Sequence, residues 1–346
     1  MRSIDEHGSE NRKTHFSSPR YNSRVRRFFF SLIALLSAAG VLHAGPLEDR
    51  RAAIDRALNF VYVTASNDAN FARYGGDMLW CFYSISHTAR DPELSATAAR
   101  MGRELAQRWH NLHQHVPADA TAENIYNLVE GAYAAGLLGV RDPQLKAELR
   151  VAVGRFKAQD YLGFDPALGP PAPDDPGRYA KLTDALIRTY TGDAYGVSMG
   201  ARYRDVLKLL PRFRPYEGHD EEMEFDIFYA VTHVVYTLNG YNERRISRAL
   251  LPQELAFLRR KLDEAIDDED PEMVGEALDC LKSAGFENDP QVQKGMEYLL
   301  ANQRPDGAWA GDEDDVYTEY HSAWTGIDGL RDYHYRGQVR KLPVKQ

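Results

Sequence analysis

Cysteine is scarce in this sequence, which contains only Cys81 and Cys280 in 346 residues. A framework of several disulfides is therefore excluded, and the two thiols form either one bridge or two buried free cysteines. Alternating runs of β-branched residues are also scarce, which argues against a β-rich fold. The motifs H-E-x-x-H and G-x-S-x-G and the phosphate-binding loop are absent, so the sequence does not indicate those enzyme classes.

Long hydrophobic runs are almost absent as well, and the one exception lies near the N-terminus. Residues 28–44 form an apolar run of 17 residues that follows Arg24, Arg26 and Arg27 and ends in small residues. This layout is typical of a secretory signal peptide, whereas a membrane-spanning helix needs about 20 residues. We therefore expect residues 1–44 to be a signal peptide or an N-terminal membrane anchor, and the protein to be exported to the periplasm or secreted.

Basic residues are too few to balance the acidic ones. The net charge is -9, and beyond residue 44 the chain has 35 basic and 48 acidic side chains. A surface with this excess of negative charge repels phosphate backbones, so we exclude nucleic acid as a partner. Apolar residues make up 43% of the chain, which is enough for a sizeable core.

After residue 45, apolar residues recur at helical spacing over most of the chain. Stretches such as residues 49–65, 95–115, 123–139 and 253–267 place them three and four positions apart, which predicts amphipathic α-helices. Prolines cluster at residues 163–179 and predict a loop there. We expect helical hairpins over residues 45–162, the proline-rich loop, and further hairpins over residues 180–340.

The second half of the chain contains a repeat. Three predicted helices each run into a glycine, at Gly240, Gly285 and Gly329, so the spacings are 45 and 44 residues. Second helices lie between them, and the repeat unit is therefore a helical hairpin. Such hairpins either stack into an open solenoid or close into a ring with an inner and an outer layer. We expect residues 226–238, 273–284 and 318–328 to be neighbouring helices that run in parallel.

One short motif favours the ring. The stretch "QRPDGAW", residues 303–309, resembles the Q-x-x-D-G-x-W motif of squalene-hopene cyclases, oxidosqualene cyclases and other α/α-toroid proteins. In that family the Gln caps a helix end, the Asp-Gly pair makes a tight turn, and the Trp packs back on the outer helix. The resemblance implies an all-α fold of the α/α-toroid class, a barrel of helical hairpins with inner and outer helices.

Two further resemblances concern the residues that follow this motif. Residues 312–315 have the letters of the D-x-D-D motif of class II terpene cyclases, in which the middle Asp donates a proton, here Asp314. The same carboxylates are also expected of a solvated loop that caps a helix. Tyr320-His321 is similar to the start of the helix that carries a zinc-binding His in protein prenyltransferase β subunits.

The repeat places three candidate ligands at a similar level. His233, Glu276 and His321 lie seven, nine and eight residues before Gly240, Gly285 and Gly329. If the inner helices run in parallel, these side chains converge, as a metal site or an acid-base set requires. Tyr317 could hold the second nitrogen of an imidazole and fix its tautomer. The alternative is that the histidines are hydrogen-bonded core residues.

These expectations leave three classes of function open. The first is an exported α/α-toroid enzyme that acts on a small or lipid-like substrate in a central aromatic cavity, with catalytic residues among His233, His321, Glu276, Tyr317 and Asp314. A divalent metal, zinc or alternatively copper or iron, would be bound by His233, His321 and Glu276. The second is a polysaccharide lyase or hydrolase that acts on a glycan. The third is a non-catalytic repeat protein that binds a peptide or protein partner.

Overall fold

The structure is a computed structural model that describes residues 46–216, 221–311 and 315–344. The chain divides into a unit of Met1–His43 and a unit of Ala44–Gln346, and every element described below belongs to the second unit. The expected signal peptide or anchor, residues 1–44, lies outside the described residues. Among the helices that are described, none is long and apolar enough to cross a membrane.

The protein is all-α, as the helical spacing predicts. The only strands in the described ranges are the two-residue strands β1 (Arg245–Ile246) and β2 (Gln338–Val339), which pair in parallel. The helices are α1 (Pro46–Ser66), α2 (Asp68–Thr88), α3 (Pro92–Leu112), α4 (Ala122–Leu137), α5 (Pro143–Ala152), α6 (Ala158–Leu162), α7 (Arg178–Tyr195), α8 (Tyr203–Leu207), α9 (Glu221–Asn239), α10 (Pro252–Asp267), α11 (Pro271–Ser283), α12 (Pro290–Asn302) and α13 (Val316–Leu330).

Aspartate followed by proline starts several of these helices. Asp91, Asp142, Asp270 and Asp289 are N-cap residues whose carboxylates accept backbone N–H groups of the first turn, and the next residue is proline in each case. The carboxylate satisfies N–H groups that have no partner within the helix, and proline has no N–H group to lose at the first helical position. The helix starts are therefore encoded locally.

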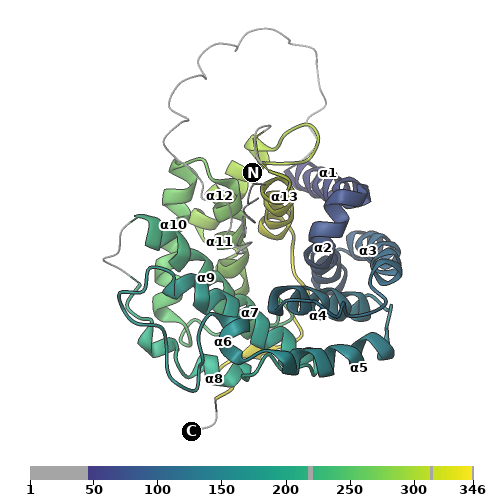
Figure 1. The fold of residues 1–346 in the computed structure, drawn as a ribbon. Coiled ribbons are helices and arrows are strands. Elements are labelled where there is room, and N and C mark those ends of the chain that lie inside the picture. Colours follow the sequence, from purple (N-terminus) through teal and green to yellow (C-terminus); the bar gives the residue numbers. More distant parts are fainter. Residues whose placement is uncertain (1–45, 217–220, 312–314, 345–346) are drawn as a thin grey trace, which may run out of the picture. The chain divides into compact units, whose positions relative to one another are not determined.

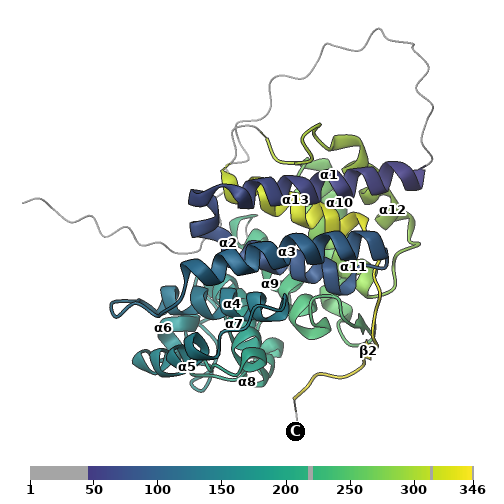
Figure 2. The ribbon, with the colours of Figure 1, turned by 90° about the vertical axis from the view of Figure 1, so that its right-hand side faces the viewer.

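Six helices contact one another in a cycle. α2 packs on α4, α4 on α7, α7 on α9, α9 on α11, α11 on α13, and α13 again on α2. Figure 1 shows these helices side by side in this order. α1 packs on α13 and α2, α3 on α2, and α10 and α12 on α11. Figure 2 shows α1 and α13 side by side along a common direction.

Three of the six helices are those that carry the repeat, and they run in parallel as predicted. Between α9 and α11, Tyr229 contacts Glu272, and Tyr236, two turns further along α9, contacts the backbone of Glu276, one turn further along α11. Between α11 and α13, the contact of Glu272 with His321 near the start is followed by contacts of Lys282 with residues 328–331 at the end. Because the contacts proceed in the same direction along both helices of each pair, the helices are parallel.

The motif at residues 303–309 forms a tight turn after α12. Gln303 ends α12 and donates to the backbone oxygens of Ala53 and Gly307 at 2.8 and 3.1 Å. Gly307 has a φ of 104°, which favours glycine in this turn. Trp309 is 6% exposed and donates from Nε1 to the oxygen of Leu299 in α12 at 2.7 Å. The indole thus connects the turn to the preceding helix, α12.

Two further expectations concern the cysteines and the proline-rich loop. Cys81 and Cys280 are both free and buried, so the alternative of a bridge between them is wrong. The chain has no helix between Leu162, the end of α6, and Arg178, the start of α7. The predicted loop is therefore present, except that Arg178 and Tyr179 already belong to α7.

Candidate metal centre

Two neighbouring helices bring three potential metal ligands together. Glu272 and Glu276 lie one turn apart on α11, so they share one face of the helix, and His321 belongs to α13, which packs on α11. One ligand atom from each side chain lies within 4.8 Å of the other two. Carboxylate oxygen and imidazole nitrogen both bind zinc and other divalent transition metals.

His321 and Glu272 form an ion pair within this cluster. Their Nδ1 and Oε1 atoms are 3.0 Å apart, and the side chains are 12% and 14% exposed. Nδ1 nevertheless has no hydrogen-bond partner, because the contact has the distance but not the angle of a hydrogen bond. Burial lowers the pKa of His321, but Glu272 and its neighbours outweigh burial and raise the pKa to about 9. The imidazole is therefore protonated at neutral pH.

Glu272 is held in its charged form. Burial acts to raise its pKa, but the ion pair with His321 and the hydroxyl of Tyr229 lower it overall. The Tyr229 O–H donates to Oε1 of Glu272 at 2.5 Å. A tyrosine from α9 therefore orients one candidate ligand, as the groups around a metal site commonly do.

Glu276 is the most buried member of the cluster. It is 2% exposed, and its Oε2 has no hydrogen-bond partner among the described residues. Burial raises its pKa to about 8, so the carboxyl group is mostly protonated at neutral pH. A buried acceptor without a partner costs about 1–3 kcal/mol of lost solvation. A cation in contact with this oxygen would offset that cost.

Aromatic side chains on α13 fix the orientation of the His321 ring. The ring of Tyr317 stacks on it with centroids 5.0 Å apart and planes at 14°. Trp324 meets it edge to face at 5.8 Å and 75°. Tyr317, His321 and Trp324 are three or four residues apart and therefore lie along one face of the helix. Tyr317 is thus next to His321, as predicted, but it contacts the face of the imidazole.

His233 lies outside the three-residue cluster. Its Nδ1 is 2.8 Å from the oxygen of Tyr229, so Nδ1 carries the proton and donates it to that carbonyl. Its ring meets Tyr236 edge to face at 5.5 Å. Burial lowers the pKa of His233 to about 4, and the charge of His321 acts in the same direction. His233 is therefore a neutral imidazole near the cluster, and the third member of the cluster is Glu272.

Two carboxyl groups that the sequence did not reveal lie on other helices of the cycle. On α2, Asp77 accepts the hydroxyl of Tyr320 at 2.7 Å, and on α4, Glu130 accepts the hydroxyl of Tyr126 at 2.8 Å. Burial raises the pKa of both carboxyl groups, to about 8 for Glu130. The charge of Asp77 contributes to the shift of Glu130. The carboxyl group of Glu130 is therefore a potential proton donor at neutral pH.

The acidic stretch before α13 provides a helix cap. Asp315 is exposed and is the N-cap of α13, where its carboxylate accepts the N–H of Thr318 at 3.0 Å. Asp314, the predicted proton donor, lies with Asp312 and Glu313 outside the described residues. The capping alternative therefore holds for Asp315.

A sequence signal existed for one residue that we missed. Glu272 and Glu276 form an E-x-x-x-E pair, a spacing that places two carboxylates on one face of a helix. Asp77 and Glu130 have no comparable local signal. The hydroxyl partner of Asp77, Tyr320, is 243 positions away in the chain.

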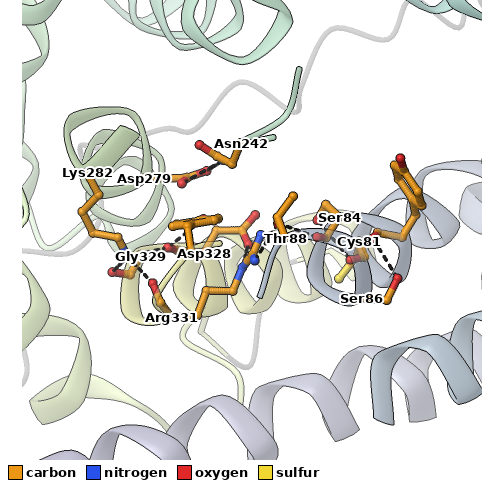
Figure 3. A network of polar contacts seen from close by, with 12 residues as sticks. Cys81, Ser84, Ser86, Thr88, Asn242, Asp279, Lys282, Asp328, Gly329 and Arg331 are labelled. Carbon is orange, nitrogen blue, oxygen red and sulfur yellow. Dashed lines mark hydrogen bonds and ion pairs between the residues drawn. The ribbon is translucent and has the colours of Figure 1, made fainter. Parts of the chain in front are cut away.

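A second polar network lies at the C-terminal ends of the same helices and is shown in Figure 3. Asn242 donates to both carboxylate oxygens of Asp279 at 3.0 and 2.8 Å. Arg331 donates to Asp328 at 2.6 Å and to the hydroxyl of Thr88 at 2.8 Å. These side chains bond one another and the backbone, so the network joins α2, α11 and α13 and has a structural role.

A pocket of about 270 Å³ lies elsewhere and is lined by Arg50, Arg51, Arg90, Asp91 and Asp332, among others. Arg50 pairs with Asp332 at 2.9 Å, and Arg51 pairs with Asp91. Arg331 also lines the pocket, so the lining contains four arginines and two aspartates and has an excess of positive charge. The pocket therefore does not suit a metal ion, and it is separate from the Glu272, Glu276 and His321 cluster.

Comparison with protein-family models, with curated proteins and with solved structures finds no match to this chain. The likeness to terpenoid cyclases and prenyltransferase β subunits consequently rests on the sequence of residues 303–309, 312–315 and 320–321 alone. Function is therefore argued from the chemistry of the site.

Proposed function

We propose that the protein is an enzyme in which Glu272, Glu276 and His321 bind one divalent transition-metal ion. One observation carries the proposal: three ligand atoms from two packed helices lie within 4.8 Å of one another, and the buried Oε2 of Glu276 has no partner. Tetrahedral coordination with bonds of about 2.1 Å places ligand atoms about 3.4 Å apart. Small side-chain adjustments would bring the three groups to that spacing.

The proposal includes an α/α-toroid architecture. The cycle of contacts through α2, α4, α7, α9, α11 and α13 supports an inner layer, and the packing of α1, α3, α10 and α12 against it supports an outer layer. Export also belongs to the proposal, and it rests on the sequence of residues 24–44 alone.

The donor set suits zinc or iron(II) better than copper(I), because two of the three ligands are carboxylates and none is a thiolate. A bound ion with three protein ligands keeps an open position and supplies Lewis-acid chemistry there. The side chains around it have defined tasks. Tyr229 orients Glu272 through its hydrogen bond, and Tyr317 holds the imidazole of His321 in place by stacking.

His233 is the candidate proton acceptor. Because its Nδ1–H donates to the Tyr229 carbonyl, the lone pair is on Nε2, and the lowered pKa keeps the ring neutral at pH 7. Glu130, with its pKa near 8, is the candidate proton donor. The reaction class that we propose is therefore metal-assisted proton transfer, with a neutral base on α9 and a protonated acid on α4.

Isothermal titration calorimetry with zinc tests this proposal. We expect one ion per chain, and we expect Glu276→Gln and His321→Ala each to weaken binding by about 100-fold. Glu148→Gln is the matched control, because Glu148 also contacts a histidine, His115, at 2.9 Å but on the surface. Absence of stoichiometric binding, or equal affinity in all four proteins, would reject the metal centre.

A further inference from the structure

Tyr241 has a backbone conformation that its residue type rarely adopts. It follows Gly240 at the end of α9, and Gly240, Tyr241 and Asn242 have φ values of 70°, 52° and 69°. Glycine tolerates this left-handed region and asparagine is enriched in it, but a bulky aromatic residue is an outlier. Such strain persists only where surrounding contacts enforce it, and it concentrates at functional positions.

The contacts that enforce this turn are buried and polar. The N–H of Tyr241 donates to the oxygen of Tyr236 at 2.8 Å, and the N–H of Asn242 donates to the side chain of Asn239 at 2.8 Å. Asn242 in turn donates to Asp279 on α11. The turn is thus anchored on both sides of Tyr241, and its geometry does not depend on the Tyr241 side chain.

The side chain of Tyr241 joins aromatic rings from three helices of the cycle. Its ring centroid is 5.2 Å from that of Trp80 on α2, 5.5 Å from Tyr190 on α7 and 6.0 Å from Tyr236 on α9. Tyr133 on α4 adds an edge-to-face contact with Trp80 at 5.4 Å. A strained turn therefore places one ring at the meeting point of the inner helices.

These rings carry polar groups. Tyr133, Tyr190 and Tyr241 are partly exposed, and within the described ranges their hydroxyls are not among the buried polar atoms that lack a partner. Burial raises the pKa of each phenol, so each hydroxyl remains protonated at neutral pH and can both donate and accept. The charges of Glu130 and Asp77 also act on Tyr241, which places carboxyl groups near the same rings.

We infer that Tyr241, with Trp80, Tyr133 and Tyr190, forms a platform that binds a neutral, hydroxyl-rich ring such as a pyranose. The apolar face of a sugar ring stacks on aromatic side chains, and its hydroxyls at the rim bond to phenol and carboxyl groups. A lipid-like substrate would leave these polar groups without partners, which is unfavourable. The inference rests on the proposed function in that it names the substrate class of the same enzyme.

Quenching of tryptophan fluorescence tests this inference, because Trp80 contacts Tyr241. The probes are cellohexaose, maltohexaose, mannohexaose and chitohexaose, with tetramethylammonium and farnesol as cationic and lipid-like comparisons. We expect at least one hexasaccharide to bind. The informative variant is Tyr241→Gly, because glycine fits the positive φ and removes only the ring. Relief of the strained φ should offset part of the lost ring contacts, so the variant should remain folded, yet it should weaken saccharide binding at least tenfold.

Two controls separate this inference from the metal centre. Tyr62→Ala removes a partly exposed tyrosine that packs on Phe82, and it should bind the saccharide as the parent does. Tyr241→Gly should bind zinc with unchanged affinity. Saccharide binding without zinc binding would overturn the proposed metal enzyme and support the platform. The platform would be overturned if none of the four saccharides binds, or if only tetramethylammonium or farnesol binds. It would also be overturned if Tyr241→Gly binds the saccharide as tightly as the parent.

Discussion

At the scale of single residues, the interior contains carboxyl groups whose pKa burial raises to neutral pH or above. Burial raises the pKa of Glu130 and Glu276 to about 8 and that of Asp270 and Asp279 to about 7. In the unfolded chain these groups ionise near pH 4. The folded protein therefore binds more protons between about pH 5 and 8, and its stability falls as the pH rises through that window. His233, with its lowered pKa, opposes this trend only below about pH 6.5.

Glu130→Gln should remove part of this pH dependence. The amide of glutamine does not ionise. The unfolding free energy of the variant therefore lacks the decrease that the raised pKa of Glu130 causes in the parent as the pH rises. Relative to the parent, it should gain about 1 kcal/mol or more in unfolding free energy between pH 5 and pH 8. Urea unfolding at several pH values measures this difference. Glu148→Gln, at a carboxyl group whose pKa is lowered, should leave the slope unchanged. Parallel curves for Glu130→Gln and the parent would contradict the assignment.

At the scale of the helix, a buried lysine holds the end of α13. The Lys282 ammonium group on α11 donates to the backbone oxygens of Asp328, Gly329 and Arg331 at 2.9, 2.7 and 2.7 Å. The last carbonyls of a helix have no intrahelical partner, so a cation at this end satisfies them and favours the helix dipole. Burial lowers the pKa of Lys282 to about 8.

Lys282→Met should therefore destabilise the protein by about 3 kcal/mol or more, because methionine keeps the bulk but leaves three carbonyls unsatisfied. Unfolding in urea gives the magnitude. The loss should also shrink above pH 8, where the parent lysine loses its charge. A change of under about 0.5 kcal/mol would show that water or the backbone replaces the ammonium group.

The tryptophan of the "QRPDGAW" turn stabilises the preceding helix. Trp309→Ala removes a buried ring and the Nε1–H bond to Leu299, so we expect a cost of about 3 kcal/mol or more. Zinc affinity per folded molecule should not change, because Trp309 does not contact the metal ligands. Thermal unfolding and zinc titration of the same preparation check both statements. An unchanged melting temperature would refute the stabilising role.

At the scale of the whole molecule, residues far apart in sequence complete the cycle of helices. α13 meets α2 through the Tyr320 and Asp77 hydrogen bond and through the bond from Arg331 to Thr88. The two pairs are each 243 positions apart. The position of Asp77 beside α13 consequently depends on packing between the start and the end of the folded unit, and local sequence cannot predict it.

The sequence predicted the features that local spacing determines and missed those that depend on contacts between distant residues. Helix periodicity and the glycine repeat predicted the all-α fold and the parallel order of α9, α11 and α13, because both are encoded in local spacing. The repeat also identified Glu276 and His321. The repeat placed His233 at the level of these two residues, whereas the three-residue cluster contains Glu272. A shift of one residue rotates a side chain by about 100° on a helix, so spacing alone does not decide which side chains converge. Asp77 and Glu130 depend on distant partners and gave no signal.

The most direct test of the metal centre is anomalous X-ray diffraction from crystals of the protein grown with zinc. We predict one strong peak at the zinc absorption edge, within about 2.3 Å of a carboxylate oxygen of Glu272, a carboxylate oxygen of Glu276 and a nitrogen of His321. The peak should be absent from crystals of Glu276→Gln. A zinc ion bound elsewhere with this cluster empty, or a peak that persists in Glu276→Gln, would contradict the proposed centre.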